Sequence, residues 1–145
     1  MKLTKFFDSK KFKIDTKGKS PAVFIKNKIK INKKLINELI KLSKLNGNIN
    51  VRICMHKNKN SNIHNMIVLI NKNQEYKRHS HPRSEEIYHL IKGKIKVLEI
   101  KKNITVNNTY LKKQGEIYAV DKNIEHIVLP ISIYAIFQEV KLKQL

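Results

Sequence analysis

The chain has 145 residues and a mass of 17.1 kDa, and its single cysteine, Cys54, excludes an intrachain disulfide; this composition predicts one domain in a reducing compartment. No uninterrupted apolar run exceeds five residues, and residues 1–13 interrupt their apolar side chains with lysine, so we expect a cytoplasmic protein with neither a membrane-spanning helix nor a signal peptide. The formal net charge of +20 would suit a nucleic-acid binder, but only three of the 31 basic residues are arginine, which phosphate recognition favours, so we do not expect a nucleic-acid partner.

Residues 1–30 are predicted to form a lysine-rich arm with one short strand at 22–26, followed by a helix over residues 32–46. Asparagine, here Asn32, is a preferred N-cap residue, and Asn46-Gly47 can adopt the left-handed backbone conformation that commonly ends a helix. A single apolar stripe predicts a helix that packs against the outside of the domain. The residues of this stripe are Ile31, Leu35, Leu39 and Leu42.

The chain from residue 48 onward predicts a β domain, because short apolar or alternating runs are separated by turn signals. Residues 66–70 are apolar at consecutive positions, so both faces of this strand should be buried, and Gly93 is predicted to turn a hairpin. Residues 102–103 and 107–108 are predicted turns. With the helix, these elements predict a mostly β sandwich or barrel in one domain covering residues 31–145. The predicted strands are 51–55, 66–70, 76–81, 86–92, 94–101, 117–120, 127–129 and 133–141.

The clearest chemical pattern is a group of histidines and carboxylates around the segment 79–86. His79 and His81 stand two positions apart, which places both imidazoles on one face of a strand. A turn then lets Glu85 or Glu86 return to that face, and His126 is a candidate fourth ligand from farther along the chain. Imidazole nitrogens and a carboxylate oxygen suit one divalent metal ion: zinc, iron, manganese or nickel.

Five further residues are candidates for contact with a ligand or for orienting a metal ligand. Arg52 and His56 share one face of a strand and could bind an anionic or sugar group, or they could lie on an exposed strand face. Glu139 lies on an apolar strand, where we expect it to pair with Arg52 or a ligand histidine. Tyr76 and Tyr88 could line a cavity, although packing in the core is the simpler role.

The spacing of the metal-binding segment resembles the first motif of the cupin superfamily. Asn73, five residues, His79-Ser-His81, four residues, Glu86, six residues and Gly93 match that motif, with Asn73 in place of its leading glycine. The distance to Gly93 selects Glu86 rather than Glu85 as the ligand.

A second cupin motif is matched in spacing more than in identity. Gly115 is followed by five residues, Asp121-Lys-Asn123, two residues and His126; Pro130 stands where the motif has asparagine. The resemblance therefore implies His126 as the fourth ligand, and it implies a single jelly-roll β-barrel with the metal inside.

The order of several residues is similar to one branch, the WbuC-type cupin metalloproteins. The residues in question are Arg52-x-x-x-His56, Met66, Tyr76-x-x-His79-x-His81-Pro and Phe137-x-Glu139-Val-Lys141. Because that branch is associated with surface-polysaccharide gene clusters, the resemblance implies a carbohydrate or sugar-nucleotide ligand and a metal-dependent isomerase or epimerase. Two alternatives stay open: a non-haem iron dioxygenase, or a non-catalytic, metal-stabilised sugar-binding or regulatory module. The resemblance also implies a homodimer.

Overall fold

The computed structural model describes residues 1–18 and 20–142, which form one helix and ten strands. Residue 19 of the predicted arm and residues 143–145 of the predicted domain lie outside this range. The helix is α1 (Lys33–Leu45). The strands are β1 (Phe12–Asp15), β2 (Ala22–Ile25), β3 (Val51–Cys54), β4 (Ile63–Asn71), β5 (Glu86–Lys92), β6 (Ile95–Lys101), β7 (Ile104–Leu111), β8 (Ile117–Val120), β9 (Glu125–Pro130) and β10 (Tyr134–Leu142).

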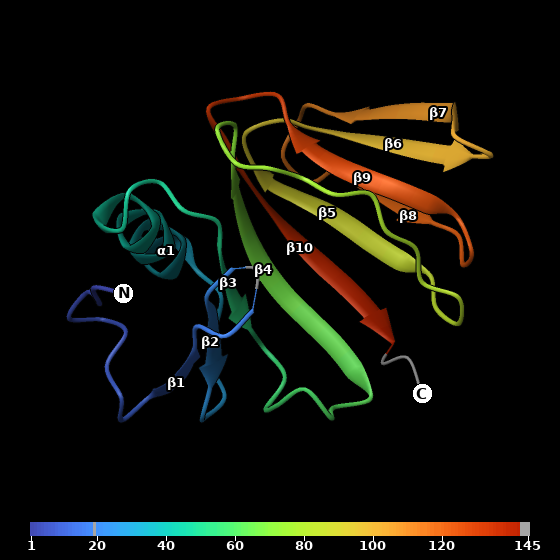
Figure 1. Cartoon of the computed structure of the whole chain (residues 1–145). Helices are drawn as coiled ribbons and strands as arrows, with labels where there is room; N and C mark the ends of the chain where they lie inside the picture. Colours follow the sequence, from blue (N-terminus) through green and yellow to red (C-terminus); the bar gives the residue numbers. More distant parts are fainter. Residues whose placement is uncertain (19, 143–145) are drawn as a thin grey trace.

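The strands form two sheets that pack face to face (Figure 1). The larger sheet has seven strands in the order β1-β2-β3-β4-β10-β5-β8, and the smaller one has the order β7-β6-β9. The core between them draws buried side chains from both sheets, for example Leu90 and Phe137 from the larger and Val97 and Leu111 from the smaller. Within the described part of the chain, no ladder of paired strands joins the two sheets. The predicted jelly-roll arrangement is therefore present as an open two-sheet structure, and a closed barrel is not found.

Side chains of β10 alternate between two apolar clusters, one on each face of the larger sheet. Ile136 belongs to the cluster under the helix, whereas its neighbours Ala135 and Phe137 belong to the cluster between the sheets. Because side chains point to opposite faces in turn, Glu139 and Lys141 follow Phe137 onto the face between the sheets. This alternation delivers charged side chains to the interior side of an otherwise apolar strand.

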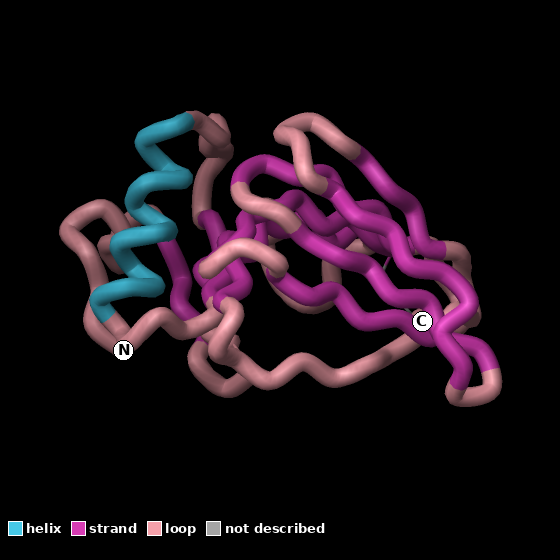
Figure 2. Tube along the Cα trace, turned by 90° about the horizontal axis from the view of Figure 1, so that it is seen from above, coloured by secondary structure: helices cyan, strands magenta, loops and turns pink. Residues whose placement is uncertain are grey.

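The helix covers the other face of the larger sheet, beside β3 and β4 (Figure 2). The Asn32 side chain accepts a hydrogen bond from the Leu35 backbone N–H at 3.0 Å, and Gly47 ends the turn with a φ of 82°, as the sequence predicts. The helix buries its apolar stripe in a cluster that also holds Phe7 and Phe12. Over the described residues, no helix combines the length and apolar content needed to cross a membrane.

Several local predictions are wrong, each because long-range pairing outweighs local signals. Segment 76–81 is not a regular strand; it contains one isolated bridge, at His79. The predicted hairpin at Gly93 does not form, since β5 pairs with β10 and β8 while β6 pairs with β7 and β9. The predicted turn at 107–108 lies inside β7, which the sequence did not predict.

The N-terminal segment is more integrated than a loose arm. β1 pairs with β2, and β2 runs parallel to β3 at the end of the larger sheet. Phe7 and Phe12 are buried against each other, with ring centroids 5.1 Å apart. The predicted strand at 22–26 corresponds to β2, whereas β1 was not predicted. The domain boundary at residue 31 stays a prediction.

Candidate metal centre

Backbone pairing brings His79 against His126, the most distant candidate ligand in the sequence. His79 and His126 form an isolated antiparallel bridge and exchange both backbone hydrogen bonds, His79 N to His126 O at 2.9 Å and His126 N to His79 O at 2.8 Å. Paired residues of an antiparallel bridge project side chains to the same side. The two imidazole rings are therefore neighbours, with centroids 4.4 Å apart.

His81 and Glu86 are positioned by different local features. Pro82 disfavours helical geometry at His81, and the Asn123 N–H donates to the His81 carbonyl at 3.0 Å. Asn123 has a φ of 64°, which asparagine tolerates better than most residues. Glu86 is the first residue of β5 and points between the sheets, whereas Glu85 is exposed. Glu86 is thus the glutamate that the fold brings to the histidines.

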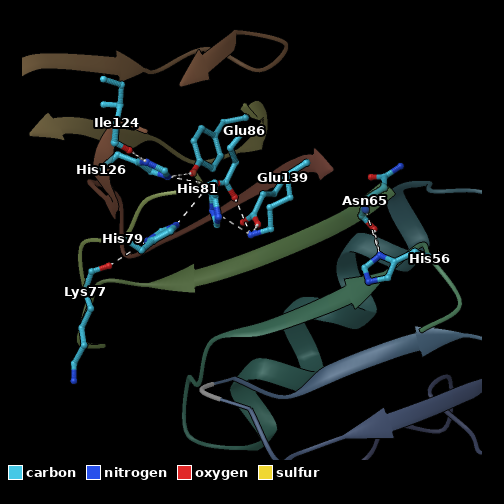
Figure 3. A network of polar contacts seen from close by, with 11 residues as sticks. His56, Asn65, Lys77, His79, His81, Glu86, Ile124, His126 and Glu139 are labelled. Atoms are coloured by element: carbon cyan, nitrogen blue, oxygen red, sulfur yellow. Dashed lines mark hydrogen bonds and ion pairs between the residues drawn. The ribbon is translucent and has the colours of Figure 1, made fainter. Parts of the chain in front are cut away.

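The four side chains converge on one point (Figure 3). Glu86 Oε2 lies 2.9 Å from the Nε2 atoms of both His81 and His126, and 3.6 Å from that of His79. One ligand atom from each of the four residues lies within 4.8 Å of all the others. Glu86 and His126 are 1% exposed, His81 is 14% exposed and His79 is 45% exposed. The cluster is therefore buried on the Glu86 side and open to solvent at His79.

The tautomer of His126 follows from its other ring nitrogen. Nδ1 lies 2.9 Å from the Ile124 carbonyl oxygen, which only accepts, so Nδ1 carries a proton and donates. In a neutral imidazole this leaves Nε2 without a proton. Two lone-pair atoms, His126 Nε2 and Glu86 Oε2, would then face each other at 2.9 Å. A cation between them, either a proton on Nε2 or a metal ion, relieves that repulsion.

The acid–base properties of the pair agree with this geometry. Burial opposes the charged form of both groups, yet hydrogen bonds from His126, His79 and His81 lower the pKa of Glu86 well below its ordinary value of 4.5. Likewise, burial is outweighed at His126, where Glu86 raises the pKa above its ordinary value of 6.5. A proton held on His126 is therefore the alternative to a metal ion.

The donor set also fits a divalent metal in composition and spacing. Ligand atoms held about 2.0–2.2 Å from one ion lie roughly 3–4.4 Å from each other, and the four candidate atoms are already within 4.8 Å. Three neutral imidazoles and a carboxylate suit zinc, iron, manganese or nickel. The cluster could hold such an ion after small side-chain shifts.

Three further residues surround the cluster. Lys141 Nζ lies 3.3 Å from Glu86 Oε1 and 3.1 Å from Glu139 Oε1, and the Tyr88 hydroxyl lies 3.0 Å from His126 Nε2. Burial and the Glu86 charge raise the pKa of Glu139, with Lys141 partly opposing them. Glu139 thus pairs with Lys141, and the prediction from sequence that it pairs with Arg52 or a ligand histidine is wrong. Lys141 was not among the candidate residues, although its position two residues after Glu139 places it on the same face.

The other candidate residues lie away from the cluster. The Tyr76 hydroxyl donates to the Asn71 carbonyl at 2.5 Å and packs beside the core. Arg52 and His56 line a separate cavity near β2 and β3. In Figure 3, His56 is seen beside Asn65, apart from the four clustered side chains.

No sequence model of a known protein family matches the chain, and no curated protein matches it. Solved structures do resemble it. KdgF from Halomonas sp. is 12% identical, with a TM-score of 0.52 over 65% of this chain and 80% of that one. The SPY1581 protein of unknown function from Streptococcus pyogenes is 14% identical, with a TM-score of 0.53 over 66% and 75%. The Cnp3 cupin domain from Schizosaccharomyces pombe is 11% identical, with a TM-score of 0.52 over 63% and 59%. At these identities the likeness shows a cupin fold and nothing finer.

Proposed function

We propose that this chain is a cupin metalloprotein of the WbuC type, in which His79, His81, Glu86 and His126 hold one divalent metal ion. Its ligand is a carbohydrate or sugar nucleotide of surface-polysaccharide synthesis. The observation that carries the proposal is the convergence of three imidazole nitrogens on one buried carboxylate oxygen. In its neutral form His126 carries its proton on Nδ1, which leaves the Nε2 lone pair available to a metal ion, and this supports a metal ligand role.

Isomerisation or epimerisation of the sugar is the reaction class that we propose. A metal bound in the cluster would supply Lewis acidity, which polarises a ligand carbonyl. The Ile124 carbonyl orients His126, and the exposed side of His79 is the direction from which a ligand can approach. Lys141 contacts the cluster at Glu86, Glu139 pairs with Lys141, and these two are the groups to which we assign proton exchange with a ligand.

Solvent exchange tests this reaction class directly. Protein loaded with zinc, manganese, iron or nickel is incubated in D₂O with nucleotide-linked keto sugars, and proton NMR follows the carbon beside the carbonyl. We expect deuterium to enter at that carbon with wild type and with the control His89→Ala, which removes a histidine from the opposite face of β5. His81→Ala should not catalyse exchange. Absence of exchange with every metal would refute isomerisation and epimerisation. Oxygen uptake by the iron form would then favour a dioxygenase, whereas binding of the sugar without turnover would favour a sugar-binding module.

The oligomeric state is a separate part of the proposal. We propose a homodimer in solution, formed by edge strands, as the resemblance to cupins implies. Light scattering coupled to size-exclusion chromatography should give twice the 17.1 kDa chain mass; the mass of a single chain would refute the dimer.

A further inference from the structure

A cavity lies on the interior face of the larger sheet, and it shares Lys141 with the surroundings of the metal cluster. It is lined by residues of β2, β3, β4 and the end of β10 and has a volume of about 190 Å³. At roughly 30 Å³ per water molecule, this is room for about six waters, which is enough for a carboxylate or phosphate group with a few attached atoms. Sites that enclose a whole drug-sized ligand start at roughly 300 Å³. The cavity, which we call the arginine cavity, is therefore sized for one end of a ligand. The charged side chains and histidines that line it are Asp15, Arg52, His56, Lys59, His64 and Lys141.

The charge of the arginine cavity is positive and incompletely compensated. Asp15, its one lining carboxylate, pairs with Lys59 at 2.9 Å, and Lys141 pairs with Glu139 and Glu86. Arg52 differs: its Nε atom is buried without a hydrogen-bond partner, and no ion pair joins it to another residue in ranges 1–18 and 20–142. A buried charged donor without a partner is unfavourable. An oxyanion would supply the missing acceptors, because the guanidinium fork binds carboxylate and phosphate in a bidentate manner.

Strand pairing connects this cavity to the metal cluster. His64 on β4 pairs with Lys141 on β10, and Lys141 in turn pairs with Glu86 on β5. Neighbouring strands lie about 4.8 Å apart, so His64 and Glu86 are separated by roughly 10 Å across the sheet. Lys141 lines the cavity and also lies 3.3 Å from Glu86. Lys141 is therefore the residue that the cavity shares with the surroundings of the cluster, while Arg52, which pairs with Val68, lies one strand farther from β5 than His64 does.

We propose that the arginine cavity binds the anionic end, a carboxylate or phosphate group, of the molecule whose other end meets the metal. This inference rests on the proposed function and narrows it to acidic sugars or sugar phosphates. Arg52 provides the guanidinium contact, and Lys141 lies between the two ends of the ligand. A neutral sugar would leave the Arg52 Nε–H unpaired and would bind more weakly.

The side-chain NMR spectrum of arginine tests the proposal in the intact chain. Since the sequence has three arginines, Arg52, Arg78 and Arg83, the Nε–H region should hold three signals, and Arg52→Met identifies one of them. Inorganic phosphate and succinate are titrated separately into metal-free protein at constant ionic strength. We expect one or both anions to shift the Arg52 signal in a saturable manner while the other two stay in place. Which anion does so distinguishes a phosphate from a carboxylate.

Matched variants separate the cavity from the general basic charge. Backbone amide signals, which every variant retains, report the affinity: Arg52→Met should weaken anion binding at least about tenfold, the loss expected when one charged hydrogen bond is removed. Lys28→Met removes the same unit of charge from an exposed loop and should bind as wild type does. Three signals that move in parallel without saturation, or no shift with either anion, would overturn the proposal. The measurement uses no metal, so failure of the metal assignment would appear separately, in the metal content of the reconstituted protein.

Discussion

Replacing Glu86 by glutamine removes a buried charge and changes little in shape. Glu86 is 1% exposed and lies 2.9 Å from the Nε2 atoms of His81 and His126. The glutamine can still form hydrogen bonds, so the cost is the loss of charge assistance. A hydrogen bond to a charged group contributes about 1.5–3 kcal/mol, against about 0.5–1.5 kcal/mol for one between neutral groups. We therefore expect the metal-free variant to lose the difference, about 1–1.5 kcal/mol of unfolding free energy at pH 7, which corresponds to roughly 4–6 °C in Tm.

The metal-binding effect of the same change should be larger. If four ligands share the roughly 10–16 kcal/mol typical of a structural zinc site, one ligand contributes about 3 kcal/mol, and its loss weakens binding by a factor of about 100. Competition with a chromophoric chelator measures this for zinc, and thermal unfolding gives the stability. Glu85→Gln is the matched control, since it removes the same charge from the adjacent, exposed residue. Unchanged zinc affinity in Glu86→Gln, or an equal loss in Glu85→Gln, would refute the ligand assignment.

Three other predictions concern the fold and its titrating groups. Gly93→Ala should lower the free energy of unfolding by at least about 2 kcal/mol, because φ is +80° and the added Cβ would lie 2.5 Å from the Tyr134 carbonyl oxygen. Gly47→Ala is the control, since Gly47 has a similar φ but open space around its Cβ position. If denaturant unfolding showed an equal loss in both variants, the clash would be contradicted. The lowered pKa of Glu86 contributes stability that is lost as pH falls below 4.5, and the raised pKa of His126 contributes stability that is lost as pH rises above 6.5. Metal-free protein should thus be most stable between these values, and His126→Gln should flatten the alkaline side; an unaltered profile would refute the pairing. Burial raises the pKa of Cys54 from 9.0 to about 11, so alkylation at pH 8 should be about 100-fold slower than for an exposed thiol; rapid labelling of the folded protein would show that the thiol is accessible.

The parts of the fold that the sequence predicted are those that depend on local chemistry. Asn32 caps the helix and Gly47 ends it, because capping and left-handed turns involve adjacent residues. Residues 66–70 are buried on both faces apart from the half-buried Val68. Local spacing also grouped His79, His81 and Glu86, since a turn of the chain suffices to bring them near one another.

The parts that were missed depend on partners distant in sequence. The polar residues of β7 look like turn residues, yet the strand is held by its pairing with β6. Gly93 does turn the chain, but β5 and β6 leave that turn into different sheets, which no local pattern distinguishes from a hairpin. Lys141 reaches Glu86 because β10 pairs with β5, and the sequence places the two 55 residues apart. Strand order, which decides these contacts, is set by packing of the whole core.

Metal content is the most direct test of the central claim. Purified protein is stripped with a chelator, reconstituted separately with zinc, iron, manganese and nickel, and measured by elemental analysis beside His79→Ala/His81→Ala and the control His89→Ala. We expect about one equivalent of metal in wild type and in the control, and loss of the metal in the double variant with the fold retained. Stoichiometric metal in the double variant, or none in wild type with any of the four ions, would contradict it.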